Sequence, residues 1–329
     1  MSPIDHIDAD DYSPLGVYPA VIVDAARYVP SAAPAQSVVI GVDREGKLPM
    51  VEESQFDVLL TSKPDAPAPW VEIASTTVRD AANALAATVA QCPMASTILC
   101  QTLRINEQLS TMDAIIAESL AYSALLGGSE FARWNRLQPR PTERPKPDPV
   151  LVEREGDLIT LTLNDAAGGN AMTAAMRDAL YAALANIADD PTAPTVTLQA
   201  AGKCFSTGGA LHEFGTADDL AAAHAVRTLH SCARIIAALG DRVTVRVHGA
   251  CVGSGMEIPA AASYRIASSG AWFQLPELRM GLIPGAGGTV TVSRAIGRHR
   301  CCWMVLSGKR VSSATALEWG LVHQIENRA

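Results

Sequence analysis

The sequence predicts an α/β fold: a core of alternating strands and helices, preceded by a smaller N-terminal α/β region and a helical segment. Three observations predict it. After residue 150, apolar runs of strand length alternate with helical patterns. Glycine-rich turns follow two of those runs, at 202–209 and 249–255. A proline-rich stretch at 138–149, QPRPTERPKPDP, separates this core from what precedes it and predicts an extended linker.

The composition is that of a globular protein that acts on small molecules. Of its 329 residues, 48% are hydrophobic and 18% are charged, which is enough for a substantial core. The net charge of −8 comes without a block of Lys or Arg, so we expect no nucleic-acid partner and no membrane partner. The acidic N-terminus does not resemble a targeting signal, and no apolar run reaches about 18 residues. A cytoplasmic protein is therefore expected.

Cysteine and histidine patterns argue against a metal site. The seven cysteines show no CxxC spacing and mostly lie in apolar runs, which is typical of reduced core residues. The seven histidines form no HExxH motif and no cluster with cysteine. We therefore predict no metal.

Residues 1–74 are predicted to form an N-terminal α/β extension, with β-like runs at 38–42 and 56–60. Residues 75–137 read as helices. Thr77-x-x-Asp80 and Ser110-x-x-Asp113 are helix-capping patterns, and Pro93 is typical of a first helical turn. In the last of these helices the apolar spacing predicts one buried face, made of Met112, Ile115/Ile116 and Ser119/Leu120.

Residues 150–329 are predicted to form the core. Strands are expected at 158–163, 195–198 and 243–247, and helices at 173–188 and 217–239. Repeated strand-then-helix units of this length indicate a parallel type of sheet with helical crossovers. In such folds ligands bind where strands lead into helix N-termini, which directs attention to the two glycine-rich turns.

These turns, at 202–214 and 248–261, expose backbone N–H groups where a strand ends. Two such donors that converge on one point form an oxyanion hole, typically worth about 3–4 kcal/mol of transition-state stabilisation per donor. The alternative is that the glycines only permit tight turns and close packing.

Two acids accompany the turns. Glu257 lies within the apolar run VHGACVGSGMEIPAAASYRIA at 247–267, and Glu277 follows in FQLPELRMGLIPGAGGT at 273–289. An ionised carboxylate in an apolar setting is costly, so such a residue is normally exposed, paired, neutral or chemically employed. Two acids beside an oxyanion hole indicate acid/base chemistry.

Together these motifs resemble the crotonase (enoyl-CoA hydratase/isomerase) superfamily over about residues 150–325. The motifs that carry the resemblance are Asn170-Ala171-Met172, CFSTGG at 204–209, HGACVGSGME at 248–257, Pro276-Glu277, GLIPGAGGT at 281–289, SGKRV at 307–311 and GLV at 320–322. They occur in the family's order and at its spacing, so the resemblance implies a ββα spiral core.

The resemblance also implies an activity. The N–H groups of Thr207 and Ser254 would bind the thioester oxygen of an acyl-CoA, while Glu257 handles a water and Glu277 the α-carbon proton. Phe205, Gly208, Gly253 and Gly285 would bind the substrate. Coenzyme A would enter as part of the substrate, with no other cofactor. Members of the family also lead us to expect a homo-oligomer, a trimer or hexamer.

Two departures concern the substrate. Ser254 stands where members often have Gly, and Ala210 where they commonly have Asp. Alternatives to a hydratase are an isomerase, an acyl-CoA or β-diketone hydrolase, and a non-catalytic scaffold. A hydrolase with Ser254 as nucleophile lacks the GxSxG elbow, since residue 252 is Val, and has no obvious histidine base. Two acids favour the hydratase, because isomerisation can proceed with one and a scaffold needs neither.

The order of segments along the chain also departs from that of the family. Crotonases usually continue past the GLV element with helices that cover the acyl pocket, whereas seven residues follow Val322 here. Residues 75–137 resemble that helical tail. We therefore hypothesise a circularly permuted crotonase, the alternative being an unrelated helical domain. Permutation predicts that Met112, Ile116 and Leu120 pack over the end of the core nearest residues 315–325.

Overall fold

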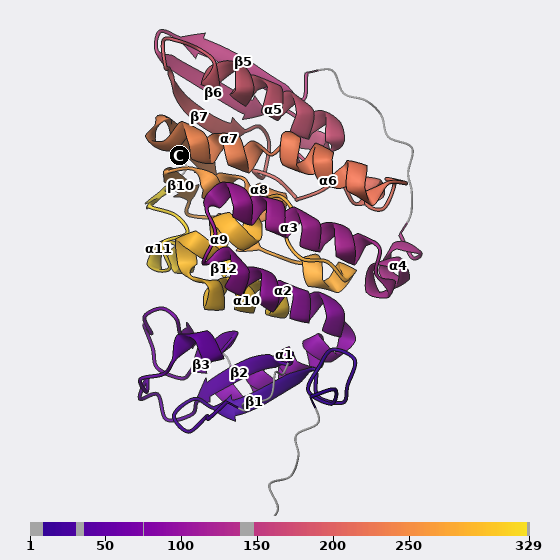
Figure 1. Cartoon of the computed structure of the whole chain (residues 1–329). Coiled ribbons are helices and arrows are strands. Elements are labelled where there is room, and N and C mark those ends of the chain that lie inside the picture. Colours follow the sequence, from indigo (N-terminus) through magenta and orange to yellow (C-terminus); the bar gives the residue numbers. More distant parts are fainter. Residues whose placement is uncertain (1–8, 31–35, 75, 139–147, 328–329) are drawn as a thin grey trace, which may run out of the picture.

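The structure is a computed structural model that describes residues 9–30, 36–74, 76–138 and 148–327. Most of the predicted proline-rich linker, 139–147, lies outside the described residues. Figure 1 shows a sheet formed by the N-terminal residues at one end of the molecule, a layer of helices next to it, and the remainder of the chain beyond.

The N-terminal sheet has four parallel strands in the order β1-β2-β3-β4. They are β1 (Ala20–Asp24), β2 (Val38–Asp43), β3 (Val58–Thr61) and β4 (Val71–Glu72). The strands predicted at 38–42 and 56–60 are thus confirmed, the second starting two residues later. Nearly all side chains of β2 and β3 are buried, as continuous apolar runs in a parallel sheet require.

Four helices follow: α1 (Val78–Gln91), α2 (Pro93–Asn106), α3 (Thr111–Leu126) and α4 (Ser129–Asn135). The predicted caps are confirmed. The side chain of Thr77 accepts the Asp80 N–H at 3.1 Å, and that of Ser110 accepts the Asp113 N–H at 3.2 Å. Pro93 occupies the first turn of α2, where its missing N–H costs nothing.

The buried face of α3 differs from the prediction. Met112, Ile116 and Leu120 are 41%, 40% and 55% exposed, so they do not pack on the core. The helix contacts α2, α6 and α9 instead, away from residues 315–325. Because α3 is apolar around most of its circumference, its periodicity does not define one face. The buried residues are Ala114, Ile115, Glu118, Ser119 and Leu125.

The core contains two sheets. The larger has the order β13-β10-β8-β7-β6-β5 and is parallel except for the β5–β6 pair. The smaller has the order β12-β11-β9. The strands are β5 (Val150–Glu155), β6 (Leu158–Leu163), β7 (Thr195–Ala200), β8 (Val243–Val247), β9 (Ala250–Val252), β10 (Tyr264–Ser268), β11 (Trp272–Gln274), β12 (Val311–Ser312) and β13 (Gln324–Glu326).

The chain alternates between these sheets before it enters a helix. It passes from β8 to β9 and then into α8, and from β10 to β11 and then towards α9. This is the predicted ββα spiral. The core helices are α5 (Ala174–Ala188), α6 (Leu220–Leu229), α7 (Cys232–Leu239), α8 (Ser254–Glu257), α9 (Gly288–Ile296), α10 (Arg298–Ser307) and α11 (Ser313–Glu318). The helix predicted at 217–239 is divided in two, because Ser231 caps a new helix, α7.

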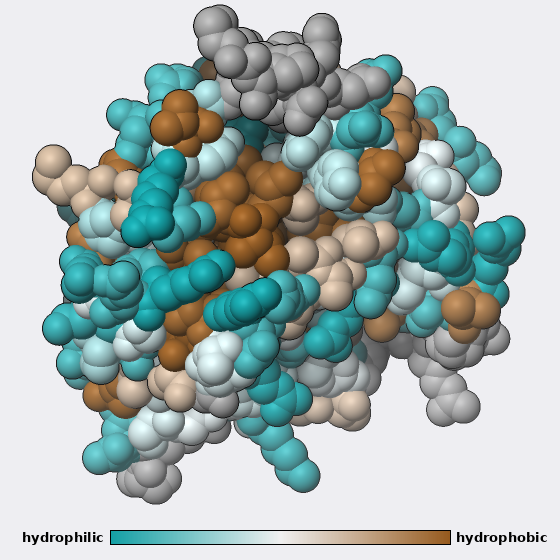
Figure 2. Space-filling model, turned by 90° about the horizontal axis from the view of Figure 1, so that it is seen from below, coloured by the Kyte–Doolittle hydropathy of each residue, from teal (hydrophilic) through white to brown (hydrophobic). Residues whose placement is uncertain are grey.

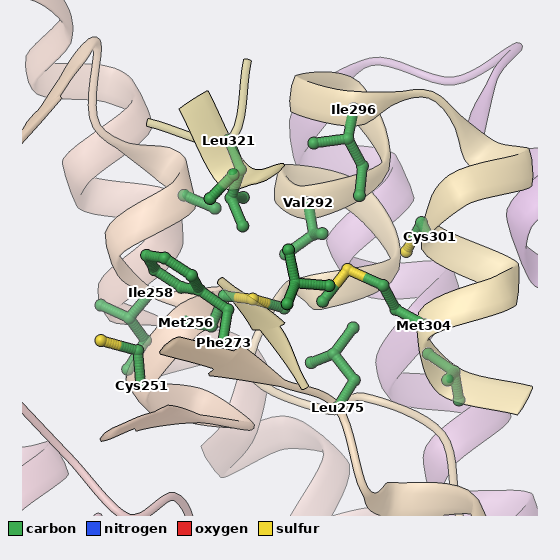
Figure 3. Close-up of a cluster of buried hydrophobic side chains, with 14 of the residues drawn as sticks. Cys251, Met256, Ile258, Phe273, Leu275, Val292, Ile296, Cys301, Met304 and Leu321 are labelled. Carbon is green, nitrogen blue, oxygen red and sulfur yellow. The ribbon is translucent and has the colours of Figure 1, made fainter. Parts of the chain in front are cut away.

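A tight hydrophobic cluster lies behind α8. Met256 and Ile258 point into it (Figure 3). There they meet Phe273 of β11, Leu275 directly after that strand, and side chains of α9 and α10. Met256 and Ile258 are 1% and 4% exposed. Because both neighbours of Glu257 are committed to this cluster, the carboxylate between them is fixed in direction.

The N-terminal region is anchored to α10. Arg298 donates to the carbonyl oxygens of Phe56 and Glu53 at 2.7 and 2.6 Å, and Arg300 donates to that of Ala66 at 2.8 Å. One face of the N-terminal sheet joins the main hydrophobic core, while the other carries a small cluster that includes Phe56, Leu59 and Trp70. Seen from this end, hydrophobic side chains gather in the middle of a hydrophilic surface (Figure 2).

Candidate active site

A cavity of about 190 Å³ lies between the core and the helical segment. Its walls come from both glycine-rich turns, from the residues that precede α9, from α6 and from α3. Both predicted acids, Glu257 and Glu277, line it, at 3% and 6% exposure. The core and the helices before it therefore share one pocket.

Glu257 and Glu277 converge on Gly253. A Cβ at that glycine would lie 2.6 Å from Glu277 Oε1 and 3.8 Å from Glu257 Oε1. Glu257 ends the short helix α8, and Glu277 begins the 3-10 turn η6 (Glu277–Met280) directly after β11. Within the described ranges, neither carboxyl forms an ion pair with Lys, Arg or His. The two acids are thus neighbours in the cavity and have no basic partner among the residues that the structure describes.

Hydrogen bonds distinguish the two acids. Glu257 Oε2 accepts the N–H groups of Ala286 at 2.7 Å and Gly288 at 3.0 Å. Glu277 Oε2 is buried and makes no hydrogen bond to the described residues. N–H donors stabilise a carboxylate, whereas a buried oxygen without a donor disfavours one.

The pKa values of Glu257 and Glu277 differ in the direction that these hydrogen bonds favour. Burial raises the pKa of Glu257 from 4.5 to about 7, against the opposing effect of its N–H donors. Burial and then the charge of Glu257 raise the pKa of Glu277 well above 4.5. Near neutral pH the pair can hold one proton, carried by Glu277, beside one carboxylate at Glu257. An acid and a base side by side at one pH are what proton transfer in both directions requires.

The predicted oxyanion hole needs one correction. The Thr207 N–H donates to Gly169 O at 2.9 Å, so it is already occupied and does not face a ligand. Two residues further on, Gly209 lines the cavity, and its N–H makes no hydrogen bond to a described residue. Gly208 has a φ of 97°, a turn that directs successive amides differently. Sequence alone does not tell which amide of such a turn is left free.

Ser254 supplies the second unoccupied amide. It begins α8 and lines the cavity, and its N–H has no partner among the described residues. Its side-chain oxygen is also buried and makes no hydrogen bond within the described ranges. Gly253 before it has a φ of 49° and donates its own N–H to Gln274 O at 2.9 Å, which holds the turn against β11.

Of the remaining residues predicted to bind the substrate, three line the cavity and one does not. Gly208, Gly253 and Gly285 line the cavity. At Gly285 a Cβ would lie 2.5 Å from the ring of Tyr122, so glycine permits the close approach of α3. Phe205 does not line the cavity: it is 2% exposed and packs in the main hydrophobic core.

A third acid in the cavity wall was not predicted. Glu118 on α3 is 1% exposed and accepts three hydrogen bonds from Gly287 and Thr289, at 2.6–2.7 Å. Burial and then the charge of Glu257 raise its pKa to about 8. The signal was present, since Glu118 lies in the apolar run AIIAESLAYSALL much as Glu257 lies in its own.

A cation lines the same wall. Arg227 of α6 donates to Ser119 Oγ at 2.7 Å and to Ser123 Oγ at 3.1 Å, and its guanidinium lies 4.7 Å from the ring centroid of Tyr122. These contacts join α6 to α3 over the cavity. Burial lowers the pKa of Arg227, which nevertheless stays a cation.

Two kinds of site are absent from the described residues. They contain no cluster of three or more His, Cys, Asp or Glu side chains arranged to hold a metal ion. Their helices include none that is both long and apolar enough to cross a membrane.

Comparison with known proteins identifies the core. The family model described as enoyl-CoA hydratase/isomerase matches residues 153–329. A 2,3-dehydroadipyl-CoA hydratase of Escherichia coli is 30% identical over 176 residues, which is 54% of this chain and 68% of the relative. A putative enoyl-CoA hydratase/isomerase of Bacillus subtilis is 32% identical over 177 residues, again 54% and 68%.

Solved structures agree with these relatives. An enoyl-CoA hydratase from Mycobacterium smegmatis is 30% identical with a TM-score of 0.50, covering 55% of this chain and 71% of that one. One from Thermoplasma volcanium is 28% identical with a TM-score of 0.50, covering 55% and 72%. The matched region carries the two turns and both core acids. The chain therefore belongs to the enoyl-CoA hydratase/isomerase family.

Proposed function

We propose that the protein is an enoyl-CoA hydratase, which adds water across the conjugated double bond of an enoyl-CoA thioester and also catalyses the reverse reaction. The observation that carries this proposal is the convergence of Glu257 and Glu277 on Gly253, with the pKa of both raised and Glu277 lacking the N–H donors that oppose the rise at Glu257. Hydration needs a base for the water, an acid for the α-carbon and a stabiliser for the enolate.

In the proposed mechanism the thioester oxygen lies between the N–H groups of Gly209 and Ser254. The Glu257 carboxylate takes a proton from a water molecule as its oxygen bonds to the β-carbon. The electron pair of the double bond moves towards the thioester oxygen, and the two amides stabilise the resulting enolate. Glu277 then donates its proton to the α-carbon. The product contains one added water, and the proton now on Glu257 returns to Glu277 through solvent.

The substrate class follows from the family. The Escherichia coli relative is named a hydratase of 2,3-dehydroadipyl-CoA, an enoyl thioester, and we propose the same class of substrate here. Coenzyme A then arrives with the substrate, and no separate cofactor is needed for any step above. We also propose a homotrimer or hexamer, which light scattering of the purified chain would test.

The deciding assay measures hydration of crotonyl-CoA and of longer and aromatic enoyl-CoA thioesters. We expect the wild type to be active, and Glu257→Gln and Glu277→Gln each to lose at least about a hundredfold in kcat, the range of a general acid or base. Double-bond isomerisation, measured in parallel, should be the slower activity. Unchanged hydration in both variants, or isomerisation that depends on Glu277 alone, would refute the proposal.

A further inference from the structure

Consecutive backbone amides at the start of α9 are shared in alternation by two acids. Glu257 binds the N–H groups of residues 286 and 288, and Glu118 binds those of residues 287 and 289. The segment is therefore held from both sides, by one carboxylate of the core and one of the helical segment. The hydroxyl of Thr289 adds a further bond to Glu118 at 2.6 Å.

The hydrogen bonds of Glu118 suit a structural role at the start of α9 rather than proton transfer. Oε1 accepts the N–H of Gly287, and Oε2 accepts both the N–H and the hydroxyl of Thr289. Both oxygens are thus occupied by donors. Thr289 in turn accepts a bond from Asn106 of α2 at 3.0 Å, so its hydroxyl proton is directed at Glu118. A buried carboxylate would be costly here without these donors and the positive end of α9.

We propose that Glu118 is a positioning residue for Glu257. It holds the turn at 286–289 so that the N–H groups of residues 286 and 288 stay directed at the Glu257 carboxylate, which keeps that carboxylate in place as the proton acceptor. The proposal rests on the proposed function in one respect only, the role of Glu257 as the base that activates water.

The electrostatic surroundings support this role. The charge of Glu257 raises the pKa of Glu118, while the N–H groups of residues 286 and 288 oppose the rise that burial gives to the pKa of Glu257. Other titratable or charged groups around this pair are Glu277 of η6, Tyr122 of α3, Cys301 of α10 and Arg227 of α6. Arg227 is the cation of this set, and it is bound to Ser119 and Ser123.

The test compares Glu118→Gln with a matched control, Glu130→Gln. Glu130 is also a buried acid of the helical segment, 7% exposed, and accepts two N–H groups at the start of α2, at 2.8 and 3.0 Å. It does not line the cavity. Any general effect of losing a buried carboxylate from a helix start should appear in both variants.

For Glu118→Gln we expect kcat for hydration to fall about tenfold at its plateau, with KM changed by less than about threefold. The acidic limb of the kcat profile should move to higher pH by about one unit, a tenfold change in an equilibrium constant, because the displaced N–H groups no longer favour the ionised form of Glu257. Glu118→Asp, whose shorter side chain reaches the turn less well, should move the limb in the same direction by less. Glu130→Gln should change neither.

A readout without substrate separates this proposal from the hydratase assignment. Carbon-13 NMR of labelled glutamate side chains should show the Glu257 carboxyl titrating at higher pH in Glu118→Gln than in the wild type, whether or not any enoyl-CoA is hydrated. An unshifted Glu257 titration in folded Glu118→Gln would overturn the proposal. So would an equal shift in Glu130→Gln. If Glu118→Gln does not fold, Glu118→Asp is titrated in its place, and an unshifted Glu257 titration in that variant would overturn the proposal.

Discussion

The carboxyl groups of Glu257 and Glu277 both lie beside the space that a Cβ of Gly253 would occupy, with Oε1 of Glu257 3.8 Å and Oε1 of Glu277 2.6 Å from it. Neither meets a cation within the described part of the chain, and burial is the largest influence on both pKa values. Proximity, burial and the lack of a basic partner together give the site one acid and one base.

The first prediction concerns pH. Glu257 must be ionised and Glu277 protonated, so kcat should follow a bell-shaped profile. Activity should be lost as pH falls below about 7, where Glu257 gains its proton. It should be lost again as pH rises through the raised pKa of Glu277. Steady-state kinetics across this range is the measurement, and a plateau that extends down to the ordinary pKa of glutamate, 4.5, would contradict the assignment.

The second prediction separates hydratase from hydrolase. The Ser254 side-chain oxygen is buried and makes no hydrogen bond to a described residue, so nothing activates it as a nucleophile. Ser254→Ala keeps the backbone N–H, and hydration should therefore stay within about threefold of the wild type. Release of free coenzyme A should be negligible in both proteins. A thioester hydrolase would instead lose its activity completely in this variant.

The third prediction uses the glycine between the acids. Gly253→Ala places a methyl group 2.6 Å from Glu277 Oε1, on a backbone with φ of 49° that disfavours alanine. We expect kcat to fall at least about a hundredfold, since the acid is displaced. Gly270→Ala is the matched control because a Cβ there meets nothing within 4 Å. Equal activity of the two variants would show that the close approach at residue 253 is dispensable.

The fourth prediction concerns the attachment of the N-terminal region. Asp57, with its side chain 1% exposed, accepts the guanidinium of Arg104 at 2.6 Å and the Val39 N–H at 2.9 Å. Asp57→Ala leaves the part-buried Val39 N–H and the partly exposed Arg104 without this acceptor and should lower the free energy of unfolding by about 1–3 kcal/mol. Urea denaturation measures it.

The control for Asp57→Ala is a surface pair. Arg246 and Glu326 also lie 2.6 Å apart, but their side chains are 47% and 41% exposed. Glu326→Ala should change stability by less than about 1 kcal/mol, because water screens exposed pairs. Similar losses in the two variants would mean that the ion pair of Asp57 adds no more stability than a surface contact.

Much of this architecture could be predicted from the sequence, for identifiable reasons. The caps at Thr77 and Ser110 depend on contacts three residues apart, and local rules describe such contacts well. The strands of the core could be predicted because apolar residues alternate with polar ones along them, as in LITLTL at 158–163 and VTVRV at 243–247. The resemblance to the family then indicated that Glu257 and Glu277 belong to one site.

What could not be predicted depends on contacts distant in sequence. The Thr207 amide is occupied because Gly169 approaches it from another segment, and nothing within the loop records that. The buried side of α3 depends on how α6 and α9 pack against it, and Met112 and Leu120 faced solvent for that reason. Glu118 gave a local signal, an acid in an apolar helix, yet its partners lie about 170 residues away.

The position of α3 has a practical consequence. Ile115, Ser119 and Tyr122 shape the cavity from a helix that precedes the core in the chain, whereas the proposed acid and base lie on the core itself. Substitutions at these three positions, with Glu118 retained, do not alter the core segments that carry Glu257 and Glu277. A library confined to these three positions is therefore a compact way to redesign which thioesters the enzyme accepts while its chemistry is held constant.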